Sequence, residues 1–238
     1  MNNNPNNLVY YIIEGVIGFI FFNRPEKMNA LNADMVMQFF EIFKKLDEDP
    51  LITFIVIKSQ GPVFSSGGDI KEVYEHYKNR KLSKIESFFN IEYSLINKIA
   101  SSKKTISLVE GLAYGAGLAV ALACQYPFFL ANTKAAAPEI KIAFYPDAGL
   151  SYWLNQADKR FPGFAHYFGM TGKDMTASDL DAAGLIAGIV DRKNMSIVEK
   201  SLIENQPRNS ADLIEIMKFF IRPTVLQEAQ NIKKSVSN

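Results

Sequence analysis

The chain has 238 residues, of which 48% are hydrophobic and 21% charged, as in an ordinary globular protein built on one large domain. Its 26 basic and 25 acidic residues give a net charge of +1, which provides no electrostatic reason to expect nucleic acid or an anionic membrane as a partner. The one cysteine, Cys124, lies in an apolar run and predicts an inert core thiol. No apolar run approaches the roughly 20 residues of a membrane span, and no basic residue precedes Arg24, so we expect neither an anchor nor a signal peptide, and a cytoplasmic location.

The first part of the chain reads as strands that alternate with helices. Residues 8–14 and 16–22 are rich in Val, Ile, Tyr and Phe, which predicts a hairpin with a buried second strand. Asn32 is a candidate N-cap for the following helix, because apolar side chains recur there at helical spacing. These side chains are Val36, Phe39, Phe40, Phe43 and Leu46. Residues 53–58 then predict a buried strand, and residues 82–100 a long helix.

The stretch from Glu110 to Glu139 is the most informative in the chain. An apolar strand at residues 104–110 leads into three closely spaced glycines and a run of small residues. The glycines are Gly111, Gly115 and Gly117. This order predicts a strand, a tight turn and a buried helix that begins near Gly115. The first N–H groups of a helix have no partner within the helix, so they can bind an anion or a developing oxyanion. A tightly packed core helix explains the same small residues equally well.

The second half of the chain carries short strands and then helices. Residues 128–131 and 188–190 predict strands, and residues 135–142 a short extended piece. Most of the chain from residue 150 onward reads as amphipathic helix, and the tail after Ser196 as wholly helical. Helix breaks are expected at Pro162–Gly163, Gly172, Pro207 and Pro223. We therefore expect an α/β core domain over residues 1–192 and a helical C-terminal segment over residues 193–238.

Histidine and metal chemistry finds little support. The two histidines, His76 and His166, do not lie at the spacing of metal ligands, and the chain has no Gly-x-Ser-x-Gly motif. A zinc enzyme and a Ser-His-Asp hydrolase are both disfavoured for these reasons. The remaining candidates for chemistry are carboxylates and backbone N–H groups.

Two glycine turns and two acids supply those candidates. Gly67–Gly68 and Gly115–Gly117 each present a backbone N–H just before a predicted helix, and two such groups at one carbonyl oxygen would stabilise an enolate or a tetrahedral oxyanion. Glu139 follows an apolar run, where a glutamate would resist ionisation and suit general acid or base catalysis; an exposed residue at a strand end explains it equally well. Asp147 is a second candidate acid, with a strong alternative as the N-cap of the next helix.

Four motifs stand in order along residues 8–192: FFNRPEKMNALN, FSSGGDIKEVY, EGLAYGAGLAVALA and AAAPEIKIAFYPDAGLSYWL. Together they resemble the crotonase superfamily, the enoyl-CoA hydratase/isomerase family. The resemblance implies a crotonase-like spiral of ββα units with a helical C-terminal portion, assembled as a homotrimer or a dimer of trimers. It also implies an acyl-CoA thioester as substrate, with CoA entering as part of the substrate, no separate cofactor and no metal.

The resemblance assigns roles to residues by position. The N–H groups of Gly68 and Ala116 would form the oxyanion hole, and Glu139 and Asp147 would be the catalytic acids. Loops at residues 27–30 and 66–70 would bind the adenine and pantetheine portions of CoA. The substrate-binding residues implied in this way are Glu92, Lys27, Met28, Ala30, Ser66, Asp69, Ile70 and Gly115.

Within the superfamily, residues 88–97 (FFNIEYSLIN) and the run YFGMTGKDMTASDLDAAGL resemble the 3-hydroxyisobutyryl-CoA hydrolase branch. Its acids match Glu92, Glu139 and Asp147, which favours hydrolysis of a short 3-hydroxyacyl-CoA. Isomerisation of a Δ3- to a Δ2-enoyl-CoA stays open, because it needs only Glu139 as base. Hydration ranks third, because the earlier of the two hydratase glutamates falls on Ala119.

The sequence also departs from the family pattern. Ala116 and Ala143 stand where the family usually has glycine, Ala119 stands where hydratases have a glutamate, and the hydrolase branch normally continues well past the length of this chain. These departures keep a function of another class open, that of a catalytically silent CoA-binding scaffold.

Overall fold

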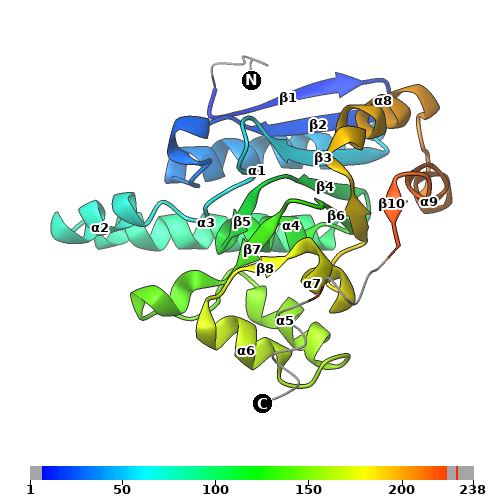
Figure 1. Cartoon of the computed structure of the whole chain (residues 1–238). Coiled ribbons are helices and arrows are strands. Elements are labelled where there is room, and N and C mark those ends of the chain that lie inside the picture. The colour runs from blue at the N-terminus through cyan, green and yellow to red at the C-terminus, as the bar shows by residue number, and fades with distance from the viewer. Residues whose placement is uncertain (1–6, 224–228, 230–238) are drawn as a thin grey trace.

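The structure is a computed structural model that describes residues 7–223 and residue 229, and within this range the strands form two sheets (Figure 1). The larger sheet has the order β1 (Val9–Glu14), β2 (Ile17–Phe22), β3 (Phe54–Ser59), β4 (Thr105–Val109), β6 (Tyr126–Leu130), β9 (Gly188–Val190) and β10 (Ile221–Arg222). The smaller sheet has the order β5 (Leu112–Tyr114), β7 (Lys134–Ala136) and β8 (Met175–Thr176).

The strand register confirms the predicted hairpin. β1 and β2 pair antiparallel with Glu14 opposite Ile17, and the strands from β2 to β9 in the large sheet pair parallel. Side chains alternate across a strand, so Ile20 and Phe22 enter one core while Phe19 and Phe21 enter the other. Both faces of β2 are therefore covered, which explains its unbroken run of buried residues.

Helices cover both faces of the large sheet. α1 (Ala33–Glu48), α3 (Leu82–Ser101) and α4 (Ala116–Ala123) contribute to one core, and α8 (Met195–Asn205) and α9 (Ser210–Met217) to the other (Figure 1). The side chain of Asn32 accepts a hydrogen bond from the Met35 N–H, which confirms the predicted cap of α1. Cys124 is buried and its pKa is raised to about 12 by burial, as expected of a core thiol.

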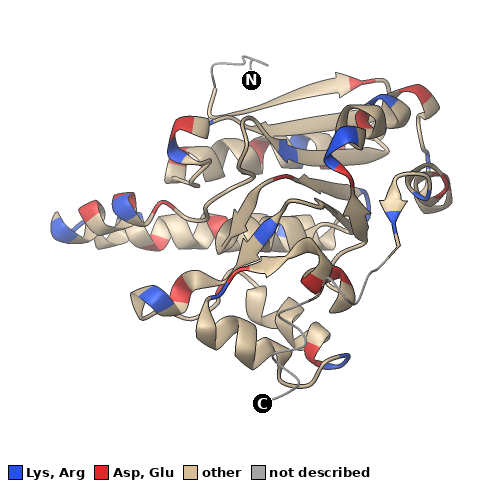
Figure 2. Cartoon of the chain, in the orientation of Figure 1, with Lys and Arg blue, Asp and Glu red and all other residues tan. Residues whose placement is uncertain are grey.

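The remaining elements are short helices. They are α2 (Ile70–Lys78), α5 (Leu150–Asp158), α6 (Phe164–Thr171), α7 (Ala177–Ala182), and the 3-10 helices η1 (Pro25–Lys27), η2 (Pro138–Ile142) and η3 (Arg192–Asn194). Gly163 begins α6 and Gly172 ends it, as predicted. Charges of both signs are intermixed along α2 and the start of α3 (Figure 2), in keeping with the balanced net charge.

Two predictions about local structure are wrong, and one strand was missed. Residues 135–142 are not one extended piece, because the strand ends at Ala136 and η2 follows. The tail is not wholly helical: α8 and α9 are separated near Pro207 as predicted, but β10 then pairs antiparallel with β9. Gly188 allows this pairing, since a Cβ there would lie 2.8 Å from the Ile221 side chain. The short strand β5 was not predicted. The helix expected after Pro223 lies outside the described residues.

Parallel strands joined by helices, followed by α8 and α9, confirm an α/β fold with a helical C-terminal portion. The domain boundary at residue 192 stays a prediction. No helix within the described part of the chain is both long enough and apolar enough to span a membrane.

Candidate active site

A cavity of about 490 Å³ lies between α2, α3, η2 and the first turn of α4. Eight of the predicted site residues line it: Gly68, Ala116, Glu139, Asp147, Glu92, Ser66, Ile70 and Gly115. Its other walls include the apolar side chains of Phe88, Phe89 and Phe144. The predicted N–H groups and acids, which are spread over some eighty positions of the sequence, therefore meet at one mostly apolar cavity.

The backbone around Gly68 turns its N–H away from the neighbouring chain. The Leu31 N–H donates to the Gly67 carbonyl at 2.8 Å, and the Asp69 N–H donates to the Leu31 carbonyl at 2.9 Å. Gly68 lies between Gly67 and Asp69, the two residues that bond to Leu31 in this parallel bridge. Its own N–H therefore points away from Leu31, toward the cavity that Gly68 lines. No partner within the described residues accepts from it.

Ala116 is the first residue of α4, so its N–H has no acceptor within the helix. Two other glycines bring this turn close to the Gly68 loop. A Cβ on Gly67 would lie 2.8 Å from the Tyr114 carbonyl oxygen, and a Cβ on Gly117 would lie 2.6 Å from the Ser65 side chain. Without a Cβ at Gly67 and Gly117, the loop of residues 65–68 can pack directly against the turn at residues 114–117. This close packing brings the Gly68 and Ala116 N–H groups to the same cavity.

Glu139 lies on η2 and is only 8% exposed, so its reading as an exposed strand-end residue is wrong. Neither carboxyl oxygen has a hydrogen-bond partner in the described structure. Burial raises the pKa of Glu139 to about 7, and the negative charge of Asp147 adds to this effect. A Cβ on Gly115 would lie 2.9 Å from Glu139 Oε1, so the acid sits directly beside the turn that carries the Ala116 N–H.

Glu92 is buried more deeply, at 3% exposed, on the face of α3 that lines the cavity. Burial raises its pKa to about 8, and the charges of Asp147 and Glu139 raise it further. At neutral pH a carboxyl with this pKa is mostly protonated.

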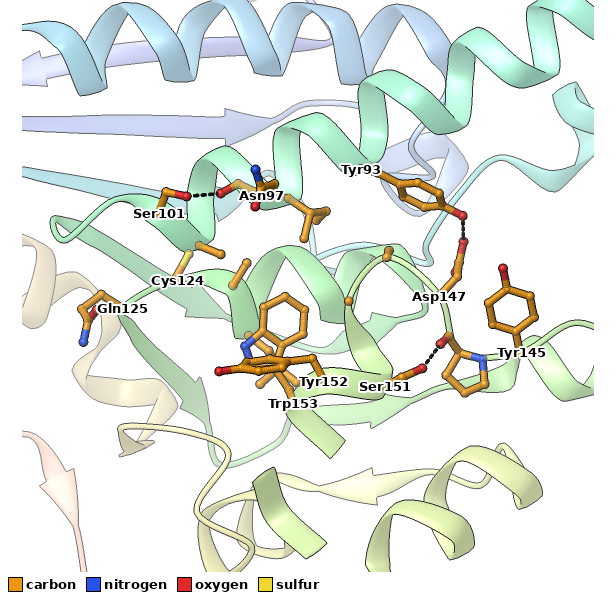
Figure 3. Close-up of a pocket in the computed structure, with 17 residues that line it drawn as sticks. Tyr93, Asn97, Ser101, Cys124, Gln125, Tyr145, Asp147, Ser151, Tyr152 and Trp153 are labelled. Atoms are coloured by element: carbon orange, nitrogen blue, oxygen red, sulfur yellow. Dashed lines mark hydrogen bonds between the residues drawn. The ribbon is translucent and has the colours of Figure 1, made fainter. Parts of the chain in front are cut away.

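Asp147 is held by a contact that the sequence pattern did not predict. The Tyr93 hydroxyl donates a hydrogen bond to Asp147 Oδ2 at 2.6 Å (Figure 3). Burial raises the pKa of Asp147, and this hydrogen bond opposes the rise. The alternative role of Asp147 as a helix N-cap is wrong, because Gly149 occupies that position in α5.

Tyr93 and Asp147 also border a second, larger cavity of about 910 Å³ (Figure 3). The spacing along α3 could have placed Tyr93 near the cavity, since Phe89 and Tyr93 lie one turn apart beside the pair Phe88 and Glu92. The sequence alone offered no signal that the Tyr93 hydroxyl reaches an acid 54 positions away.

Four predicted substrate-binding residues do not line the cavity: Lys27, Met28, Ala30 and Asp69. The loop that carries the first three adjoins it, because the Met28 carbonyl accepts a hydrogen bond from the Ser66 N–H at 3.0 Å. Asp69 instead pairs with Arg24 at 2.7 Å and caps α2. Their role in binding CoA stays a prediction.

The alanines that depart from the family pattern have distinct surroundings. Ala143 has a φ of 58°, a left-handed conformation that favours glycine. Ala119 is fully buried in the core beneath the site, so no carboxyl is supplied from that position. Among the described residues, no group of three His, Cys, Asp or Glu side chains could hold a metal ion.

Known proteins match both the sequence and the fold. A family model described as enoyl-CoA hydratase/isomerase matches residues 17–237. The mitochondrial 3-hydroxyisobutyryl-CoA hydrolase of Bos taurus is 32% identical over 208 residues, which cover 85% of this chain and 53% of that protein. 3-Hydroxyisobutyryl-CoA hydrolase 1 of Arabidopsis thaliana is 28% identical over 204 residues, with 84% and 53% covered. The chain thus spans about half the length of these curated relatives.

Solved structures extend the match to the fold. A carnitinyl-CoA dehydratase from Mycobacterium thermoresistibile superposes with a TM-score of 0.84 at 22% identity, covering 98% of this chain and 67% of that one. An enoyl-CoA hydratase from Bacillus halodurans gives 0.76 at 21% identity, covering 97% and 91%. The crotonase-like fold is confirmed, and the chain belongs to the enoyl-CoA hydratase/isomerase family.

Proposed function

We propose that this protein hydrolyses the thioester of a short 3-hydroxyacyl-CoA. The observation that carries the proposal is the meeting of the Gly68 and Ala116 N–H groups, which have no acceptor among the described residues, with the buried Glu139 and the partly buried Asp147 at one cavity. The similarity to proteins named 3-hydroxyisobutyryl-CoA hydrolases supports the choice of reaction within the family.

In the proposed mechanism the thioester oxygen accepts hydrogen bonds from the two N–H groups, which stabilise the negative charge that develops there. Glu139, with a pKa of about 7, is ionised in a large fraction of molecules near neutral pH. It acts as base toward water, or as the nucleophile itself, at the carbonyl carbon. As base, Glu139 takes a proton from the water that adds to the carbonyl carbon; the tetrahedral intermediate expels CoA as the thiolate, which takes up that proton, and the free 3-hydroxy acid remains. As nucleophile, Glu139 forms a mixed anhydride as the CoA thiolate leaves, and water then cleaves the anhydride to release the acid and restore the carboxylate. Asp147 is fixed through Oδ2 by Tyr93, so its other oxygen orients the water or the substrate hydroxyl.

The test is a panel of acyl-CoA esters assayed for thiol release, with wild-type protein and the Glu139→Gln and Asp147→Asn variants. We expect each variant to lower thiol release by about 10²-fold or more, because loss of a general base costs about this much at Glu139, and misplacement of the water or substrate costs a similar factor at Asp147. Glu86→Gln serves as the matched control, because Glu86 is exposed and does not line the cavity. Its rate of thiol release should match that of wild type. Thiol release that survives both substitutions would refute the mechanism.

A second candidate is Δ3-Δ2 enoyl-CoA isomerisation, because it needs only one base and Glu139 can supply it. The buried Ala119 offers no second acid, which favours isomerisation over hydration. An ultraviolet change in an enoyl thioester without thiol release would support it over hydrolysis. A change of neither kind, with CoA esters still bound, would favour the scaffold function. Assembly as a homotrimer or a dimer of trimers and a cytoplasmic location stay predictions, and light scattering in solution tests the first.

A further inference from the structure

Glu92 lies close to Gly68, whose N–H is one of the two groups of the proposed oxyanion hole. α3 carries Phe88 and Glu92 one turn apart, and both face Gly68. A Cβ on Gly68 would lie 3.6 Å from Phe88 Cζ and 3.8 Å from Glu92 Oε1. The glutamate oxygen is therefore close to the peptide whose N–H points into the cavity. It has no hydrogen-bond partner in the described structure.

The groups that face Glu92 favour its neutral form. Glu139 and Asp147 line the same cavity and are acids themselves, and the Tyr93 hydroxyl is already bonded to Asp147. Lys141 also lines the cavity but is exposed, and within the described chain no Lys, Arg or His forms an ion pair with Glu92. A buried carboxyl among acids keeps its proton, and its pKa of about 8 agrees. In that form it is a hydrogen-bond donor.

We propose that Glu92 is a third donor of the oxyanion hole, and that its carboxylic O–H donates to the thioester oxygen beside the N–H groups of Gly68 and Ala116. The proposal rests on the proposed binding of an acyl-CoA thioester at this cavity. The proton stays on Glu92 throughout, so the step adds a hydrogen bond and no proton transfer. A neutral donor also avoids a repulsion: an ionised Glu92 at this position would disfavour the negative charge that develops on the oxygen.

The kinetic test compares Glu92→Gln with Glu92→Leu, and with Glu92→Met in case the leucine variant does not fold. Glutamine keeps a donor at the same position, whereas leucine and methionine remove it. We expect thiol release by Glu92→Gln to stay within about tenfold of wild type, and that by Glu92→Leu to fall by about 10²- to 10³-fold, as for loss of one oxyanion-hole donor. The fall in rate of wild type at alkaline pH, where Glu92 ionises, should be absent in Glu92→Gln. A glutamine variant as inactive as the leucine variant would overturn the proposal.

A spectroscopic test separates this inference from the proposed reaction. In a Glu139→Gln background, the infrared carbonyl stretch of a bound ¹³C-labelled acyl-CoA thioester reports the hydrogen bonds to its oxygen without turnover. We expect this frequency to be lower with Glu92 or Gln at position 92 than with Leu. Equal frequencies for all three would overturn the inference. If no acyl-CoA releases thiol yet the frequencies differ, the hydrolase proposal fails while the donor role of Glu92 is supported.

Discussion

Burial of Glu92 leads to a quantitative prediction about stability. Its pKa rises from 4.5 to about 8, chiefly through burial and further through the charges of Asp147 and Glu139. One pKa unit corresponds to about 1.4 kcal/mol, so ionisation of this side chain costs on the order of 5 kcal/mol more in the folded than in the unfolded state. Because the folded-state pKa is the higher one, this contribution to stability is fully present below pH 4.5 and is lost as the pH rises through about 8.

The Glu92→Gln variant removes this titration. We expect the free energy of unfolding of wild type, relative to that of the variant, to fall by about 3 kcal/mol between pH 5 and pH 8. Urea unfolding followed by circular dichroism at several pH values measures it. Glu86→Gln, an exposed acid on the same helix, should run parallel to wild type. If the Glu92→Gln and wild-type curves run parallel as well, Glu92 is ionised in the folded protein and the reasoning on its environment is wrong.

Three further substitutions test the geometry of the site. Ala143→Gly should raise the free energy of unfolding by about 1 kcal/mol in urea, because it relieves a left-handed alanine; an unchanged or lower value would contradict this. Gly115→Ala should lower thiol release by tenfold or more in the same acyl-CoA assay, since the new Cβ would lie 2.9 Å from Glu139 Oε1 and would displace it; wild-type rates would show that the position of this acid is not critical. Tyr93→Phe removes the hydrogen bond that lowers the pKa of Asp147, so the acidic limb of the pH–rate profile should move to higher pH. An unmoved limb would mean that the reaction does not need ionised Asp147.

Much of the fold follows from local sequence patterns. The β1–β2 hairpin, the Asn32 cap of α1 and the breaks of α6 at Gly163 and Gly172 depend on neighbouring residues, so the sequence predicts them directly. β5, η2 and β10 were missed because they are short and depend on partners far away in the chain.

For the site, the sequence by itself determined which groups are available: glycine turns with free N–H groups before α2 and α4, and the acids at positions 92, 139 and 147. Only the tertiary structure decided their chemical state. The pKa of a carboxyl depends on the solvent, charges and hydrogen bonds that surround it, and remote segments supply these. Tyr93 reaches Asp147 across 54 positions of the sequence. Burial on the face of α3 that lines the cavity keeps Glu92 protonated, while Glu139 on η2 titrates near neutrality.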